Sequence, residues 1–149
     1  MTQSITITLA CPPQKLKPNV RSHHMAKASA TRTYRAHAAD AAMDECEVHG
    51  GWEPIAEPKV TITYYHKTRA FMDRDNILAS LKAAFDGFTD AGLWTDDHAC
   101  LYMPIRREKD AEHPRVEITV SEGARHRMAL ILSACGLICF WLAYLRWGR

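Results

Sequence analysis

The sequence predicts a single α/β domain of the α+β type, with a mixed β-sheet and about two main helices in the order β-α-β-α-β-β. Three stretches, residues 4–9, 60–65 and 115–120, alternate apolar and polar side chains, as half-buried strands do. An alanine-rich stretch separates the first two, and a segment with helical spacing of apolar residues follows the second. A chain of 149 residues is long enough to build one substantial core.

The first strand and the segment that follows it differ in charge. Ser4 to Leu9 alternates strictly, and the strand is predicted to end before Pro12-Pro13. From there to Ala39 the chain has no acidic residue, but it carries Lys15, Lys17, Arg21, Lys27, Arg32 and Arg35. This basic arm predicts contact with a phosphate backbone, because each neutralised phosphate releases a counterion. A solvated, flexible loop is the alternative.

The two predicted helices follow from different patterns. Residues 26–48 are rich in alanine, and Gly50-Gly51 is expected to end that helix. In the segment Asp73–Asp97 the apolar residues recur at helical spacing, so one side of the helix must be buried. Gly92 then lets the chain turn back, and Trp94 is expected to anchor the return in the core.

The aspartates of this segment predict a metal site. The turn at Gly92 is expected to bring Asp96 and Asp97 toward Asp73 and Asp75, and carboxylates that converge repel each other unless a cation lies among them. Hard oxygen ligands suit Mg²⁺, with Mn²⁺ as a substitute. Lys82 falls on the same side of the helix as Asp75, where it can hold a phosphate oxygen. Taken singly, each aspartate can also be a helix cap or a turn residue.

The same residues carry a resemblance to a known family. Asp73-Arg74-Asp75-Asn76, the helix with Lys82-Ala83-Ala84-Phe85-Asp86, and the later Asp96-Asp97 pair resemble the core signature of RusA-family Holliday junction resolvases. The resemblance implies that Asp73, Asp75 and Asp97 bind Mg²⁺ and act in catalysis with Lys82, whereas Asp96 is the less favoured member of its pair. It also implies a homodimer that cuts four-way DNA junctions as a crossover junction endodeoxyribonuclease.

The sequence departs from this signature between Asn76 and Lys82. Five residues lie between them, where the family pattern commonly has two. Three extra residues are close to one helical turn, so Lys82 keeps its side of the helix and shifts by about 4.5 Å along the axis.

The remaining predicted elements complete the sheet. Residues 99–103 are predicted to be a strand, and residues 115–120 are predicted to be the last one. Arg106, Arg107 and Lys109 form a second basic cluster between them. Arg69, Arg106 and Arg107 are expected to contact DNA with the basic arm. His66 is expected at the surface or base of the site rather than on the metal, because Mg²⁺ prefers oxygen. The resemblance covers roughly residues 4–121, so residues 1–122 are taken as the RusA-like domain.

Residues 126–149 depart from the family. Met128 to Leu145 is an uncharged run of eighteen residues, which spans about 27 Å as a helix, near the lower limit for crossing a bilayer. Basic residues flank it on both sides, so the orientation is ambiguous. The sequence leaves three interpretations open: a transmembrane segment with membrane contact through residues 128–145, a helix buried in a dimer interface, or a helix packed on the sheet.

The cysteines indicate a reducing compartment. Their number is odd and none forms a C-x-x-C pair: Cys11, Cys46, Cys100, Cys135 and Cys139. The beginning of the sequence alternates polar and apolar residues, unlike a signal peptide. A cytoplasmic protein is therefore expected, with membrane anchoring through the apolar tail left open.

These observations predict a Mg²⁺-dependent endodeoxyribonuclease that acts on branched DNA in recombination and repair. The alternatives are a less selective metal-dependent nuclease, a branched-DNA-binding protein whose shifted Lys82 has weakened catalysis, and a membrane-tethered protein with a vestigial nuclease domain.

Overall fold

The computed structural model describes residues 3–21, 23–68 and 72–123. In chain order its helices and strands are β1 (Ser4–Ala10), η1 (Gln14–Leu16), α1 (His24–Val48), β2 (Pro58–His66), α2 (Arg74–Asp90), η2 (Asp97–Ala99), β3 (Leu101–Tyr102), β4 (Arg106–Lys109) and β5 (Arg115–Glu122). Here η denotes a short 3-10 helix. The predicted α+β fold with a mixed sheet and two main helices is confirmed.

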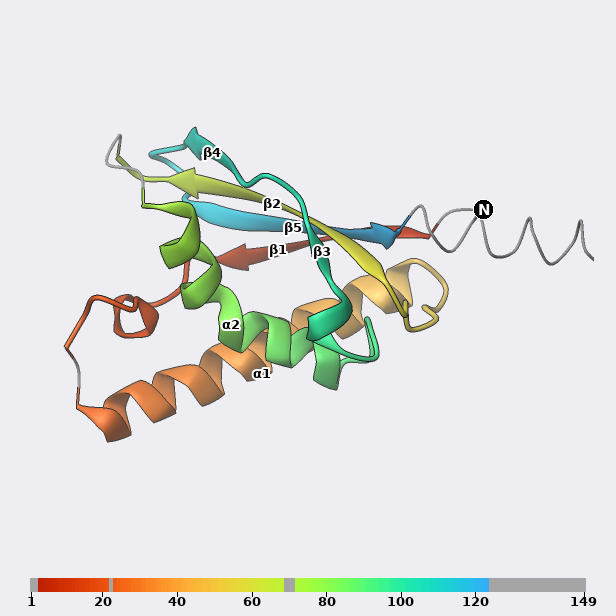
Figure 1. Ribbon diagram of the computed structural model, residues 1–149, viewed down its shortest axis with the longest axis horizontal. Helices are drawn as coiled ribbons and strands as arrows, with labels where there is room; N and C mark the ends of the chain where they lie inside the picture. The colour runs from red at the N-terminus through yellow and green to blue at the C-terminus, as the bar shows by residue number, and fades with distance from the viewer. Residues whose placement is uncertain (1–2, 22, 69–71, 124–149) are drawn as a thin grey trace, which may run out of the picture.

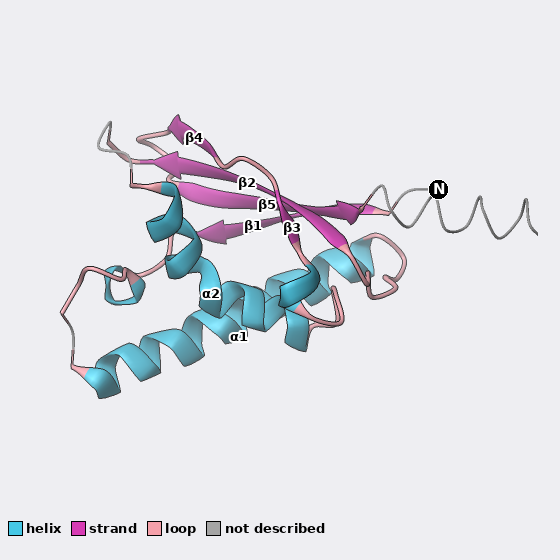
Figure 2. Ribbon diagram, viewed as in Figure 1, coloured by secondary structure: helices cyan, strands magenta, loops and turns pink. Residues whose placement is uncertain are grey.

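The sheet has five strands, and β5 lies between β1 and β2, antiparallel to both. The short strands β3 and β4 pair with β2 in parallel. Because β1 and β2 run the same way, α1 is the crossover between them, and α2 is the crossover from β2 to β3. Figures 1 and 2 show both helices on one side of the sheet. Helix α2 starts beside the end of β2 and runs away from the strands toward α1. The site segment therefore begins beyond the carboxyl end of β2.

Alternation along the strands determines which side chains face the helices. In β1, β2 and β5 every second residue is buried, so the predicted half-buried strands are confirmed. Helix α2 meets this surface with the apolar residues that the sequence pattern selected: Ile77, Leu81, Ala84, Phe85 and Phe88 are buried, and Leu78 is partly buried. The prediction for residues 99–103 is only partly met, since a 3-10 turn occupies part of it and the strand is two residues long.

The two helices approach each other closely at a glycine. A Cβ atom placed on Gly87 would lie 2.3 Å from the backbone oxygen of Arg35, and 3.2 Å from the Cβ atom of Ala38. Only small side chains permit such an approach, and the buried residues of α1 are Tyr34, Ala38 and Ala42. The alanine content of α1 thus serves its contact with α2.

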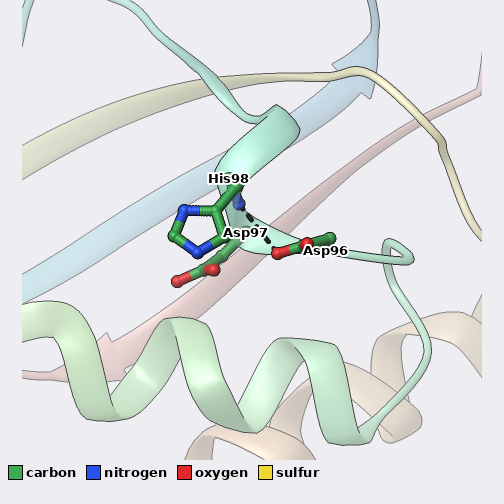
Figure 3. A group of neighbouring side chains, drawn as sticks. All are labelled: Asp96, Asp97 and His98. Carbon is green, nitrogen blue, oxygen red and sulfur yellow. Dashed lines mark hydrogen bonds between the residues drawn. The ribbon is translucent and has the colours of Figure 1, made fainter.

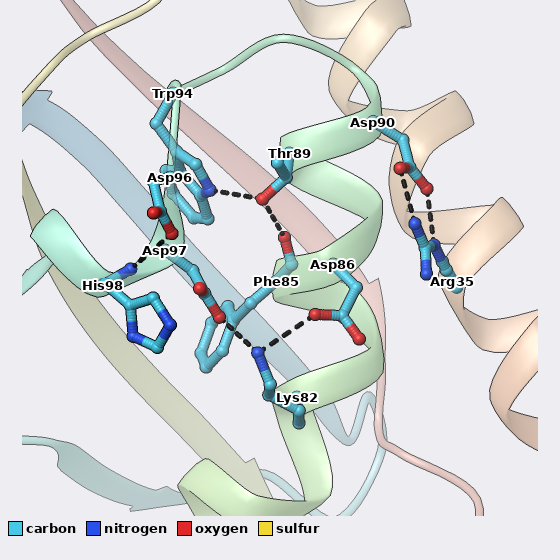
Figure 4. Close-up of polar contacts among 10 residues, drawn as sticks. All are labelled: Arg35, Lys82, Phe85, Asp86, Thr89, Asp90, Trp94, Asp96, Asp97 and His98. Atoms are coloured by element: carbon cyan, nitrogen blue, oxygen red, sulfur yellow. Dashed lines mark hydrogen bonds and ion pairs between the residues drawn. The ribbon is translucent and has the colours of Figure 1, made fainter.

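Both helices end as predicted, at glycines with positive φ. Gly92 has a φ of 74°, and its amide donates to the Thr89 carbonyl at 3.1 Å while the Leu93 amide donates to the Phe88 carbonyl at 3.0 Å. Gly50 ends α1 in the same way, with a φ of 77°. Trp94 follows the turn and is 1% exposed, and its indole nitrogen donates to the Thr89 hydroxyl at 2.8 Å. This turn brings the Asp96-Asp97 pair back over α2 (Figure 4).

Several predictions concern residues outside the described ranges. They are the apolar C-terminal helix of residues 126–149, the DNA contact of Arg69, and the free thiols of Cys135 and Cys139. Within residues 3–123, leaving aside the gaps, no helix has both the length and the apolar character needed to cross a membrane.

Candidate metal centre and nucleic-acid interface

Lys82 and Asp97 are in direct contact, although fifteen residues separate them in the chain. Lys82 stands on the exposed side of α2, and its Nζ atom donates to Oδ2 of Asp97 and, at 3.1 Å, to Oδ1 of Asp86 (Figure 4). Asp86 lies one helical turn further along α2, and Asp97 comes from η2. The Gly92 turn therefore delivers one predicted metal ligand to the predicted catalytic lysine.

Mutual contact shifts the pKa values of both groups away from neutrality. The hydrogen bond from Lys82 lowers the pKa of the Asp97 carboxyl, and the hydrogen bonds to Asp97 and Asp86 raise the pKa of the Lys82 ammonium group. Both side chains are therefore charged at neutral pH. The site therefore presents a charged carboxylate in direct contact with a charged ammonium group.

Replacing Lys82 with methionine is expected to raise the pKa of Asp97 toward the ordinary aspartate range, because the largest cause of its lowering is removed. A lowered carboxyl pKa means that the pair stabilises the fold above the unfolded-state pKa of Asp97. This contribution is lost as pH falls through the lower, folded-state pKa. Carboxyl-carbon NMR titration of both proteins measures the change.

The control for this titration is Asp90, whose pKa is lowered by its own partner, Arg35. It must stay lowered in the Lys82→Met protein. An unchanged titration of Asp97 in that protein would show that the lysine does not hold the carboxylate in solution.

Asp97 also belongs to a group of converging metal-ligand atoms. Within the described ranges, Asp96, Asp97 and His98 are the one group of such residues whose ligand atoms all lie within 4.8 Å of one another (Figure 3). The His98 amide donates to Oδ1 of Asp96 at 3.0 Å, which fixes that carboxylate at the start of η2. The two carboxylates are oxygen donors of the kind that the implied Mg²⁺ prefers, and the imidazole is a nitrogen donor that Mn²⁺ also accepts.

Asp73 and Asp75 lie at the start of α2, and Asp75 is on the same side of the helix as Lys82. Asp73 is the N-cap residue of α2, although its side chain makes no capping hydrogen bond in the described structure, and Asp75 is in the first turn. Asp75 precedes Lys82 by seven residues, or about 10 Å along the helix axis. The ligand atoms of Asp73, Asp75 and Asp97 do not all lie within 4.8 Å of one another. A metal shared by these three aspartates is thus not assembled in this structure, and it stays a prediction.

Aromatic and thiol side chains lie near this cluster on the sheet side. The rings of Phe85 and Tyr102 are 5.4 Å apart, and both side chains are at least partly buried. Burial raises the pKa of the neighbouring Cys100 thiol to about 11, and it also raises the pKa of Tyr102. Cys100 is therefore protonated at neutral pH, which makes it a poor nucleophile. The chemistry of the site rests on its carboxylates and its lysine.

A groove connects the basic arm with Lys82. It has a volume of about 290 Å³, lies between η1, α1 and α2, and is lined among others by Lys27, Thr31, Lys82 and Asp86. Lys27 also lines a wider hollow on α1, of about 530 Å³, together with His24, Arg32 and Arg35. The two hollows share Lys27, so basic side chains line the surface from the outer side of α1 to Lys82.

Arg35 differs from the other predicted DNA contacts because it is held by α2. Its guanidinium donates to both carboxylate oxygens of Asp90, at 2.5 and 2.6 Å (Figure 4). The pair connects the two helices beside the close approach at Gly87. A phosphate would have to compete with Asp90 for this arginine, so its DNA contact stays a prediction.

A second group of cations surrounds the carboxyl end of β2. The Arg107 guanidinium donates to the carbonyl of Met72 at 3.5 Å, one residue before Asp73. Burial lowers the pKa of His66, and the charges of Arg107 and Lys17 lower it further. Arg107 stands opposite Tyr64 in the pairing of β4 with β2. His66 is 8% exposed, at the base of this region. Lys15, Arg21 and Arg106 are exposed, and Arg69 lies outside the described residues.

Comparison with known proteins relates the chain to a protein of Xylella fastidiosa. No protein-family model matches the chain. A protein of Xylella fastidiosa (strain Temecula1 / ATCC 700964), named "Uncharacterized protein", is 30% identical over 124 residues, which cover 80% of this chain and 77% of that protein. Its name states no activity, so the function has to be argued from the site.

Proposed function

Because the chain belongs to one family with the uncharacterized Xylella fastidiosa protein, whose name gives no chemistry, we propose a function from the site itself. The protein is a Mg²⁺-dependent, structure-selective endodeoxyribonuclease of the RusA type. It resolves Holliday junctions by paired phosphodiester hydrolysis in DNA recombination and repair.

The observation that carries this proposal is the contact between Lys82 and Asp97. The RusA resemblance selects these two residues from separate parts of the chain as catalytic lysine and metal ligand. In the structure the lysine touches that carboxylate. An ammonium group beside a metal-binding carboxylate is the arrangement that phosphodiester hydrolysis uses, since both charges then face the same phosphate.

Each residue has a distinct role in this mechanism. Asp97, with Asp96 beside it, would hold the metal ion, which would supply an activated water and neutralise charge on the scissile phosphate. Lys82 stabilises the negative charge that develops on the phosphate oxygens, and Asp86 keeps its ammonium group in place. Asp73 and Asp75 lie at the start of α2, where they offer further carboxylates to the substrate-bound site. Lys27 and the other cations of the arm hold the DNA backbone.

Two copies of the chain would suit a four-way junction, which has two-fold symmetry and requires two symmetric nicks. The homodimer comes from the RusA resemblance, and it implies that one active site serves each of the two cleaved strands.

One observation favours a second function, that of a branched-DNA-binding protein with weakened catalysis. The ligand atoms of Asp73, Asp75 and Asp97 do not all lie within 4.8 Å of one another, so one metal ion does not have all three as direct ligands in this arrangement. If the carboxylates at the start of α2 cannot join Asp97 when DNA binds, the protein would hold junctions without cutting them.

Incubation of the full chain with a labelled four-way junction and with a linear duplex, each with Mg²⁺ or with chelator, tests the proposal. We expect paired nicks in the junction alone, dependent on Mg²⁺, and reduced in an Asp75→Asn variant. Equal cutting of duplex would indicate an unselective nuclease. Junction binding without cleavage under every metal condition would overturn the resolvase proposal in favour of the binding protein.

A further inference from the structure

His98 is a residue that the sequence patterns did not single out, and its position beside two carboxylates is built by the local backbone. The η2 turn begins directly after Asp96, and the hydrogen bond from the His98 amide to Asp96 closes that turn. The imidazole then stands next to the carboxylate of Asp97 (Figure 3). Three consecutive side chains thus offer one nitrogen and two oxygen atoms that all lie within 4.8 Å of one another.

Such a mixed donor set discriminates between divalent cations. Mg²⁺ takes oxygen ligands almost entirely and keeps several waters, so an imidazole adds little to its affinity. Mn²⁺ accepts carboxylates equally well and also binds imidazole nitrogen. A histidine beside two aspartates therefore favours Mn²⁺ over Mg²⁺.

We propose that Asp96, Asp97 and His98 form a divalent-metal site in which His98 is a direct ligand, and that this site selects Mn²⁺ over Mg²⁺. The proposal rests on the proposed function for the presence of a metal at Asp97. It adds a ligand and changes the preferred ion.

Lys82 does not prevent metal binding at this position, because it has a second carboxylate partner. Its ammonium group is shared between Asp97 and Asp86, and its side chain is 59% exposed. When a metal takes Asp97, Lys82 remains anchored by Asp86 and stays beside the metal-bound group. Asp97 can then bind the ion while the ammonium group of Lys82 keeps Asp86 as its carboxylate partner.

The test measures metal binding directly, on the full chain without DNA. Pulsed electron paramagnetic resonance of the Mn²⁺-loaded protein reports nitrogen atoms bound to the ion, and calorimetric titration gives the affinities for Mn²⁺ and Mg²⁺. The variant is His98→Gln, which removes the imidazole but keeps a polar side chain. The matched control is His113→Gln, at an exposed histidine in the loop before β5.

We expect a nitrogen signal in the wild-type protein and in the His113→Gln control, and its loss in His98→Gln. Removal of this ligand should weaken Mn²⁺ binding by about 10-fold and leave Mg²⁺ binding nearly unchanged. Absence of the nitrogen signal in the wild type, its persistence in His98→Gln, or an equal loss of both metals would each overturn the proposal.

Failure of this proposal is distinguishable from failure of the proposed nuclease function. A nitrogen signal from His98 without any junction cleavage supports the metal site and overturns the nuclease. Mg²⁺-dependent junction cleavage with no nitrogen signal supports the nuclease and overturns the role of His98.

Discussion

Asp97→Asn is expected to reduce metal-dependent cleavage of a four-way junction by about 1,000-fold. The change removes a charged metal ligand and, at the same time, one of the two carboxylate partners of Lys82. The carboxylate of Asp97 is the one point at which the candidate ligand group and the lysine meet. An amide of the same shape keeps the side-chain packing but carries no charge. The rate of junction cleavage at saturating Mg²⁺ measures this effect.

The control is Asp44→Asn, which removes an exposed aspartate from the C-terminal half of α1 at the same cost in net charge. It should cleave like the wild type. Circular dichroism of both variants should be unchanged, since the asparagine keeps the shape of the partly buried Asp97 side chain. Cleavage by Asp97→Asn within about threefold of the wild type, a change of under 1 kcal/mol in activation free energy, would remove this residue from the mechanism.

Gly87→Ala is the second change with a large expected effect, and here the sign of the effect is decisive. Helix propensity alone favours alanine over glycine by about 1 kcal/mol within a helix. The structure opposes this gain, because the new Cβ atom would lie 2.3 Å from the backbone oxygen of Arg35. A backbone atom cannot move away as a flexible side chain can, so α1 and α2 must separate. We expect a net loss of about 2 kcal/mol in the free energy of unfolding.

Denaturant unfolding of the wild type and the variant measures this loss. Ala36→Gly, on the exposed side of α1, is the control for propensity alone and should cost about 1 kcal/mol. Stabilisation by Gly87→Ala would mean that the two helices do not approach each other in solution as they do here.

The fold was predictable from the sequence because its elements follow local rules. Alternation fixed the strands around Ile7, Ile62 and Ile118, and the apolar spacing of α2 identified the side that the sheet buries. The two helix ends followed from glycines that adopt positive φ. The strand predicted at residues 99–103 is shortened to Leu101–Tyr102, and the 3-10 turn that Asp96 caps extends to Ala99 at its start. Whether such a segment forms a capped turn or a strand depends on its place in the fold. The alternation of polar and apolar residues does not predict that place.

The site was predictable only in part, for similar reasons. The motif selected Lys82 and Asp97, and the structure brings them together. It did not reveal His98, because an isolated histidine after an aspartate pair has no distinctive spacing. The pairing of Arg35 with Asp90 was also hidden, since it depends on how closely α1 approaches α2 at Gly87. Contacts between segments far apart in the chain cannot be predicted without knowing how the helices pack. Contacts along one helix can be predicted by counting residues in the sequence.

The length of α2 between Asp75 and Lys82 has a consequence for how such chains can diverge. Each residue added to a helix rotates everything beyond it by about 100°. A single insertion between these two residues would turn Lys82 away from Asp75, and only changes of three or four residues restore a shared side. Relatives of this protein should therefore differ in this segment by whole helical turns, which makes insertion length a simple criterion for retention of the site.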